Sequence, residues 1–526
     1  MERIPFVGLH AHSGVGSPFD GFGYPKDHMN YAHSNGAKAL ALTDHGNMNG
    51  LVYQVMHAKK MQAEGKDFKP IFGVEAYFIP SVAEWKEQIE VFRKDKKLAK
   101  QIDKEQSGTT IENEGASKGI TKHDINKRRH LVLLAQNQTG LNNIFKMVSK
   151  SYTGDNFYRY PRIDLALLEE YGEGVIAASA CLGGVYAGCY WENRDEGPEA
   201  ILNCMLKVTE EMQAVMGDRW YGELQWNNIP EQHELNQYII QVHERTGLKL
   251  ISTCDSHYPS PEAWQSRELY KRLGWLGRKP EWASMELPLT VDEVGYELYP
   301  KNGNQMWDSY KFYSEACGVT YNDDIVYQSI IETATIAFDR IESFLPDTTV
   351  RLPDFVVPAG TDATSYLGQL AFEGLLSVLG SKGIKQNSPQ FKDYNKRLNS
   401  ELDVINAQGF AKYFLTMKAI VDKTSEVQLA GPGRGSAAGS LVAYALEITQ
   451  VDPIEYGLLF SRFLRTDQTD MPDIDYDVSD PMVLKEKLIE DWGDDVVVPI
   501  SNWNTLQLKS LIKDVSRLYE IPFAEV

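Results

Sequence analysis

The sequence predicts an α/β protein in which a distorted barrel of about seven strand–helix units comes first and a smaller, mixed α/β region follows. Three observations predict this. Short apolar runs alternate with segments of helical period in the first half, and these apolar runs end in polar residues, as in α/β barrels. Amphipathic segments at residues 365–379 and 394–405 then precede a glycine-rich stretch at residues 431–440.

The barrel strands are predicted from apolar runs that carry a polar residue at or near one end. They cover residues 6–13, 39–46, 70–77, 131–135, 174–180 and 249–254. A helix is predicted at residues 50–63, between the second and third of these strands. Since the sites of α/β barrels lie at strand ends, this edge is the place to look for chemistry.

The polar residues at these ends are all of types that bind divalent metals. They are His10, His12, His45, Glu75, His130, Cys181, Asp255 and His257. Imidazole, carboxylate and a single thiolate together suit Zn²⁺ or Mn²⁺. Any one of them alone is better interpreted as structural, and Cys181 alone as a buried apolar residue. Their shared position favours a metal site.

Composition bounds the class of protein. The 526 residues, 43% of them apolar, suffice for about two to four domains. No apolar run of about 18 residues and no leader pattern is found, so we expect a cytoplasmic protein without a membrane segment. The net charge of −20 argues against a protein that coats nucleic acid, although a local basic groove remains possible. The five cysteines have no paired spacing, which favours reduced thiols over a disulfide framework.

Two segments between the predicted strands are interpreted as surface or packing elements. Residues 85–128 form a charged insertion, part helix and part loop. The basic cluster Lys127, Arg128 and Arg129 at its end is interpreted as a charged surface, with contact to DNA as the alternative. The aromatic residues 152–162 are interpreted as a packed loop.

The glycine-rich stretch has the properties of an anion cradle. Glycines let the backbone N–H groups approach phosphate oxygens, while Arg434 and Ser436 add a forked cation and a hydroxyl. No Gly-Lys-Ser/Thr closes the loop, which excludes the P-loop ATPase pattern. The segment therefore indicates binding of a nucleoside triphosphate outside that class.

Two aspartates follow the cradle at short range. In a strand, Asp473 and Asp475 would project from one face and Ile474 into the core. Two such carboxylates can bind a pair of Mg²⁺ ions for in-line phosphoryl transfer. A lone pair of this kind is more often an acidic turn, but its proximity to a phosphate-type loop favours a nucleotidyl-transfer site.

These blocks resemble the palm of the alpha subunit of bacterial replicative DNA polymerase III, a C-family polymerase. The matching blocks are GPGRGSAAGSLVAYAL at 431–446, Asp-Pro at 452–453, LLFSRFL at 458–464 and MPDID at 471–475. The resemblance implies that Asp473 and Asp475 are catalytic metal ligands. It likewise implies that Arg434, Gly435, Ser436 and Arg462 contact the incoming nucleotide.

The first half resembles the PHP (polymerase and histidinol phosphatase) domain that heads these subunits. The resemblance implies a trinuclear metal set whose residues are His10, His12, Asp20, His45, Glu75, His130, Cys181, Asp255 and His257. An intact set implies metal-dependent phosphoester hydrolysis, with 3′–5′ exonuclease proofreading as a hypothesis.

The resemblance also implies the domain order. We expect a PHP domain at 1–285, a helical connector at 286–350, a nucleotidyltransferase-type palm at 351–495 and the start of a helical thumb or palm-return segment at 496–526. Residues 500–515 depart from the family pattern, and the family's third palm aspartate, fingers and clamp contacts lie beyond Val526.

We therefore expect primer–template DNA, dNTPs, a chain carrying the missing parts and, through it, a sliding clamp as partners. The alternatives are a stand-alone PHP phosphoesterase and a scaffold without catalysis.

Overall fold

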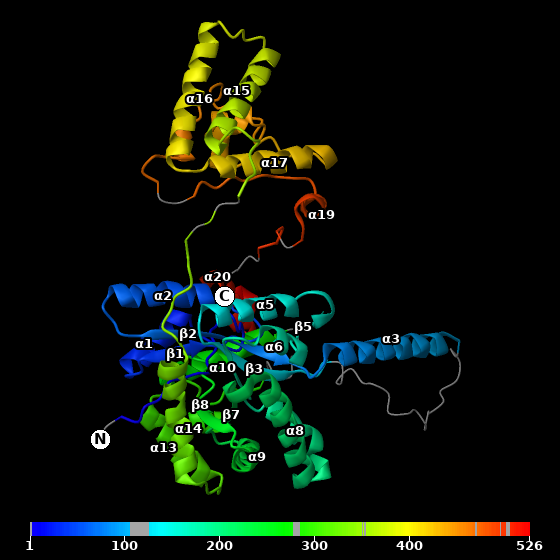
Figure 1. The fold of residues 1–526 in the computed structure, drawn as a ribbon, viewed down its shortest axis with the longest axis vertical. Helices are drawn as coiled ribbons and strands as arrows, with labels where there is room; N and C mark the ends of the chain where they lie inside the picture. Colours follow the sequence, from blue (N-terminus) through cyan, green and yellow to red (C-terminus); the bar gives the residue numbers. More distant parts are fainter. Residues whose placement is uncertain are drawn as a thin grey trace. The chain divides into compact units, whose positions relative to one another are not determined.

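The computed structural model describes residues 3–105, 126–276, 285–349, 351, 354–468, 471–494, 496–500 and 505–526 (Figure 1). The chain divides into two compact units. The first, Met1–Asp347 with Leu506–Val526, we call the barrel unit; the second, Thr348–Thr505, we call the helical unit. Residues 106–125 of the expected insertion and 501–504 of the departing segment lie outside the described residues. The finer domain boundaries stay predictions.

The barrel unit is built on a six-stranded sheet in the order β1-β2-β3-β6-β7-β8. Its strands are β1 Ala39–Leu42, β2 Lys69–Phe78, β3 Arg129–Ala135, β6 Val175–Ala178, β7 Trp220–Gln225 and β8 Lys249–Thr253. Five of the six coincide with strands that we predict from apolar runs. The α/β class is therefore confirmed, and β7, whose residues are all buried, is an addition.

The direction of β3 decides which of its residues reaches the site edge. This strand runs antiparallel to both β2 and β6, while β1–β2, β6–β7 and β7–β8 are parallel. His130, near the start of β3, therefore pairs with Tyr77 near the end of β2. The amino end of an antiparallel strand lies at the edge where parallel strands present their carboxyl ends.

The amino-terminal segment closes the sheet. Gly8 bridges to Leu40 of β1, and Ala11 bridges to Ser256 just after β8, both in parallel sense. The segment thus joins the first and last strands of the sheet through single bridges, in place of the continuous strand expected at residues 6–13. It brings His10 and His12 into the barrel, where both are buried.

Besides the sheet, the barrel unit contains several helices. They are α1 Pro25–Ser34, α2 Leu51–Ala63, α3 Val82–Glu105, α5 Gln138–Ser151, α6 Leu165–Tyr171, α7 Val185–Asn193, α8 Pro198–Met216, α9 Pro230–Thr246, α10 Trp264–Trp275, α12 Val291–Val294, α13 Gly303–Ala316, α14 Asp323–Thr335 and α20 Leu508–Leu518. In α5, for example, Asn137 caps the first turn, and Leu141, Ile144 and Met147 recur at helical spacing and are buried. No helix in the described ranges is both long and apolar enough to cross a bilayer.

The helical unit packs α15 Ala363–Ser381, α16 Pro389–Ala407, α17 Ala411–Val427 and the short α18 Leu441–Ala445 around one apolar core. A further helix, α19 Pro481–Trp492, packs on α17. Leu367, Ala371, Leu375 and Leu379 form the buried stripe of α15. The strand expected at Asp473 and Asp475 is not present. Among the described residues of this unit, the only β-type pairing is the single bridge between Ala430 and Val478. Residues 471–477 therefore do not pair with any strand.

A disulfide joins Cys189 of α7 to Cys204 of α8, with 5.5 Å between their Cα atoms. The expectation of reduced thiols is therefore wrong for these two residues, and it holds for Cys181, Cys254 and Cys317. Sequence spacing could not reveal the pair, because packing of α7 on α8 brings together residues that are 15 positions apart.

Replacing Cys204 with serine should lower the free energy of unfolding of the oxidised chain. Opening a loop of 15 residues removes about 3 kcal/mol by the chain-entropy estimate. Urea denaturation with and without reductant measures the difference. Reductant should abolish it, and Cys317→Ser, which changes a free thiol, should behave as wild type. Equal stability of oxidised and reduced wild type would show that the disulfide contributes nothing.

Candidate functional site

The carboxylate of Glu75 lies at the centre of a buried cluster at the sheet edge. Its Oε1 lies 3.3 Å from His10 Nε2 and 3.0 Å from His130 Nδ1. Its Oε2 lies 2.5 Å from His45 Nδ1 and 3.6 Å from His12 Nε2. Four imidazoles from three separate segments therefore converge on one side chain of β2.

Asp255 forms a second centre in the cluster. Its Oδ1 lies 3.0 Å from His12 Nε2, 3.2 Å from His10 Nε2 and 3.5 Å from His257 Nδ1. The Asp255 backbone is left-handed, with φ of 47°, a conformation that few non-glycine residues adopt. This turn directly after β8 places Asp255 and His257 in the same cluster. Strain of this kind concentrates at functional sites.

Asp20 and Cys181 complete the set. Asp20 Oδ2 lies 3.2 Å from His45 Nε2 and 3.6 Å from His257 Nε2. Cys181 Sγ lies 3.6 Å from His130 Nδ1 and 3.9 Å from Glu75 Oε1. The structure therefore brings all nine residues of the expected metal set together.

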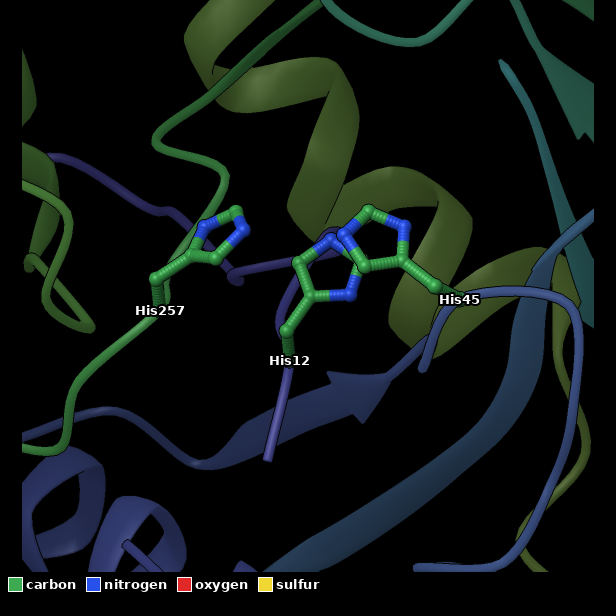
Figure 2. Close-up of side chains that lie close together, drawn as sticks. All are labelled: His12, His45 and His257. Atoms are coloured by element: carbon green, nitrogen blue, oxygen red, sulfur yellow. The ribbon is translucent and has the colours of Figure 1, made fainter. Parts of the chain in front are cut away.

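The rings of His12, His45 and His257 face one another in Figure 2. The ring centroids of His12 and His45 lie 4.1 Å apart, and those of His12 and His257 lie 4.5 Å apart. Within the described residues, candidate ligand atoms gather within 4.8 Å in three overlapping groups: His12–His45–His257, His10–His12–Glu75 and His45–Glu75–His130.

The donor atoms of the cluster fit divalent metal ions. Five buried atoms contact one another at short range but make no hydrogen bond of acceptable angle: His10 Nε2, His12 Nε2, His45 Nδ1, Glu75 Oε2 and Asp255 Oδ1. Buried polar atoms are normally hydrogen-bonded, so five convergent exceptions call for an explanation. Imidazole nitrogens and carboxylate oxygens that point at a shared space are the ligands of zinc and manganese sites.

In the absence of metal ions, burial and neighbouring charges determine which groups of the cluster are charged and which are neutral. Burial alone would lower the pKa of His10, but Asp255, Glu223 and Glu75 hold it well above its usual value. Burial, helped by His45 and His257, keeps the pKa of His12 well below its usual value. Burial opposes ionisation of Glu75, but the neighbouring imidazoles bring its pKa well below the usual range. A neutral His12 and an ionised Glu75 are the ligand forms that metals bind.

Glu223 of β7, which the sequence did not single out, contacts the cluster through His10. It is buried, and its Oε1 lies 2.7 Å from His10 Nδ1 while accepting hydrogen bonds from Thr253 Oγ1 at 2.5 Å and Gln225 Nε2 at 3.0 Å. A carboxylate on Nδ1 orients the ring so that Nε2 faces the cluster. The available signal was an acidic residue inside a fully buried strand.

Asp44 was also missed, and it anchors the loop that carries Asp20. It accepts hydrogen bonds from Ser13 N at 2.6 Å and from Ser17 Oγ at 3.1 Å. Burial raises the pKa of Asp44 to about 6, although these donors oppose the shift. Arg267 Nη2 binds Asp20 Oδ1 at 2.6 Å from the other side. Asp20 is thus held in place by groups outside the expected ligand set.

In the helical unit the glycine-rich loop packs on the acidic segment. Gly435 has φ of 66°, and a Cβ there would lie 2.2 Å from Asp475 Oδ2, so the position requires glycine. Gly431 N donates to Asp477 O at 2.9 Å, and Arg434 Nη1 lies 3.1 Å from Asp477 Oδ1. The cradle and the second aspartate are therefore neighbours.

Ile474 is buried, while Asp473 before it is exposed and Asp475 after it is partly exposed. The two carboxylates project away from the core, as the alternation of the segment predicts. Ser436 opens a turn of 3₁₀-helix, Ser436–Gly439, which contacts the turn Phe460–Arg462. The segments that carry all six expected nucleotide-site residues therefore lie in one region.

An ion pair between partly exposed Arg397 and buried Glu401 braces this loop. Glu401 Oε2 accepts hydrogen bonds from Ser440 Oγ at 3.0 Å and Val442 N at 3.1 Å. Arg397 pairs with Glu401 at 2.5 Å and donates to Gly439 O at 3.1 Å. Neither residue was expected from the sequence, although their spacing of four on α16 allows an ion pair.

Comparison with known proteins identifies two regions. Residues 8–226 match the PHP domain, and residues 365–526 match the bacterial DNA polymerase III alpha NTPase domain. A DNA polymerase III subunit alpha of Aquifex aeolicus is 33% identical over 525 residues, which are 99% of this chain and 40% of that protein. One of Borreliella burgdorferi is 31% identical over 532 residues, again 99% of this chain and 40% of the relative.

Among solved structures, a candidate metal-dependent phosphoesterase from Bifidobacterium adolescentis matches 49% of this chain and 90% of its own. The identity is 16% and the TM-score 0.24, values too low to carry weight. The chain spans about two fifths of the length of the curated relatives that it matches. The chain is a homologue of bacterial DNA polymerase III alpha subunits, and along it a PHP domain match is followed by a match to the alpha-subunit NTPase domain.

Proposed function

We propose that this chain forms part of a replicative DNA-directed DNA polymerase that acts in the cytoplasm. The helical unit binds the incoming dNTP with Mg²⁺ for transfer onto primer–template DNA. A polypeptide region that carries a third aspartate, the fingers and the sliding-clamp contact completes the polymerase. The observation that carries this proposal is the packing of the glycine-rich loop on Asp475.

The residues of the loop have separable roles in this proposal. The open backbone at Gly435 and the hydroxyl of Ser436 contact phosphate oxygens of the nucleotide, and the guanidinium groups of Arg434 and Arg462 neutralise its charge. Asp473 and Asp475 hold the magnesium ions. When bound, Mg²⁺ supplies the positive charge that stabilises the attacking and leaving oxygens of phosphoryl transfer.

The charge balance of the loop explains why nucleotide binding needs a cation. Asp475 faces Gly435 directly, so without a cation its charge repels a triphosphate in the loop. Arg434 offsets part of this repulsion, but its guanidinium already pairs with Asp477. A divalent ion between carboxylate and phosphate removes the conflict.

Binding of a fluorescent dATP analogue to the chain should therefore require Mg²⁺. Asp475→Asn and Ser436→Ala should each weaken binding about tenfold, the loss of one charge-assisted contact. Asp393→Asn, an exposed acid on α16, is the matched control and should bind as wild type. Fluorescence titration with and without Mg²⁺ measures the affinities. Binding that ignores both Mg²⁺ and Asp475 would refute the assigned role of the loop.

A second activity is favoured by the nine-residue cluster. We propose that the PHP domain, loaded with Zn²⁺ or Mn²⁺, hydrolyses phosphoesters, with 3′–5′ exonuclease proofreading as the specific role. When bound, such ions supply the positive charge that activates water and neutralises the phosphate. The chain's own residues hold the ions, and Glu223 and Asp44 fix the orientation of His10 and the position of the Asp20 loop.

Replacing both His10 and His12 with alanine should abolish hydrolysis of a mismatched primer end. Each removes a ligand rather than a supporting group, so we expect a loss of at least about 100-fold. His57→Ala on α2, outside the cluster, should leave the rate unchanged. Gel analysis of primer shortening with Mn²⁺ measures it.

Unchanged hydrolysis in the double variant would refute the assignment. Cleavage of small phosphate esters but not of primer ends would instead support a stand-alone phosphoesterase. A chain that cleaves neither substrate would support a scaffold.

A further inference from the structure

The basic residues Lys127, Arg128 and Arg129 serve different purposes in the structure. Arg129 pairs with Glu192, and Lys127 Nζ lies 3.8 Å from Glu192 Oε1. Arg128 points to the other side, as alternation along an extended backbone requires. Across the described ranges of the chain, no acidic side chain forms an ion pair with Arg128; its Nη1 donates a hydrogen bond to Asn126 O at 3.3 Å, and its Nε has no hydrogen-bond partner.

Arg128 instead lies against two tyrosines. Its Cζ is 3.6 Å from the ring centroid of Tyr160 and 5.0 Å from that of Tyr77. Tyr77 in turn lies 5.5 Å from the ring of His130 and is stacked at 6.4 Å on that of His45. The Tyr77 ring therefore lies between the Arg128 guanidinium and the histidines of the metal-type cluster.

Strand register explains this placement. Tyr77 pairs with His130, and Phe78 with Arg129. Side chains alternate, so Glu75 and Tyr77 share a face of β2 with His130, and Arg128 continues that face beyond the start of β3. Two residues of extended backbone separate Arg128 from His130 by about 7 Å. A cation thus lies just outside the cluster, on the face from which Glu75 projects.

The hairpin that carries Tyr160 is firmly held. Its strands are β4 Phe157–Tyr158 and β5 Tyr160–Pro161. Buried Arg162 donates hydrogen bonds to Tyr158 O and Tyr160 O, both at 2.9 Å, and lies 4.1 Å from the ring centroid of Trp85. Burial and the nearby charge of Arg128 lower the pKa of Arg162 to about 10. The backbone that carries Tyr160 is therefore held in place, and within the described residues no carboxylate pairs with the Arg128 guanidinium next to it.

The surface next to this hairpin offers stacking area. Tyr152 and Phe157 are 46% and 44% exposed, and their rings are stacked with centroids 5.8 Å apart. Exposed, pre-stacked aromatic rings are one of the features by which proteins bind single-stranded nucleic acid without reading its sequence. A small phosphate ester has no second phosphate that could contact Arg128 and no base that could stack on these rings.

We propose that Arg128 binds the backbone phosphate next to the one at the metal-type cluster, so that the site selects a nucleic-acid strand over a small phosphate ester. The proposal rests on the hydrolytic function proposed above. A planar guanidinium oriented by two rings presents its N–H groups as a fork, which matches the oxygens of a phosphate. Arg128 is then a specificity-determining residue for the strand end.

Binding without turnover tests the contact directly. Fluorescence anisotropy of a labelled five-nucleotide thymidine strand is measured on the full chain in chelator. Arg128→Gln should weaken binding at least fivefold and lower the slope of log affinity against log salt by about 0.7, the value for one phosphate of a single strand. Arg128→Lys should restore the slope, and Arg159→Gln, at the exposed hairpin tip, should match wild type. Wild-type affinity in Arg128→Gln would overturn the proposal.

Kinetics with Mn²⁺ separates this role from a structural one. On the oligonucleotide, Arg128→Gln should raise KM about tenfold with little change in kcat. On the p-nitrophenyl ester of thymidine 5′-phosphate, which has one phosphate, it should change neither. An equal loss on both substrates would show that Arg128 acts through the cluster or the fold, against the proposal. If wild type cleaves neither substrate, the hydrolytic function fails, and the anisotropy comparison still decides the role of Arg128.

Discussion

The burial of the Glu75 carboxylate among four imidazoles is the constraint on which the barrel unit depends. An ionised carboxylate without partners is very costly in the protein interior, so the charge of Glu75 must be matched wherever the fold places it. The matching groups come from the amino-terminal segment, the end of β1 and the start of β3. Closing the barrel and assembling the site are therefore one event. Glu223 of β7 and Asp44 are also buried carboxylates that need partners. Glu223 contacts His10 and Thr253, and Asp44 accepts hydrogen bonds from Ser13 and Ser17.

The helical unit meets a related problem with fewer groups. Asp475 faces the glycine-rich loop at Gly435, and the loop itself is braced by the Arg397–Glu401 pair. In both units carboxylates gather at the sites proposed to bind phosphate, in a chain whose net charge is −20. In this account, divalent ions and isolated cations such as Arg128 offset the repulsion between these carboxylates and a phosphate. The acidity of the whole chain and an affinity for phosphate are therefore compatible.

How much the sequence predicts depends on whether a feature is local. Strand-end positions indicated eight of the nine cluster residues, because each of these follows from a short apolar run and its end, whereas Asp20 came from the family resemblance alone. Glu223 escaped because its strand, β7, has no solvent face and so no alternation to reveal it. The Cys189–Cys204 pair depends on how α7 packs on α8, and the antiparallel course of β3 on its neighbours. The strand expected at Asp473 failed because strands need partners, and residues 471–477 have none in a ladder.

The central claim is that the nine clustered side chains form a metal centre. Anomalous diffraction from crystals grown with Mn²⁺ tests it most directly, since the signal locates the ion without reference to activity. The account predicts strong peaks between His12, His45 and His257, and beside Glu75 where it faces His10 and His130. Well-ordered side chains at these positions with no anomalous peak among them would contradict it.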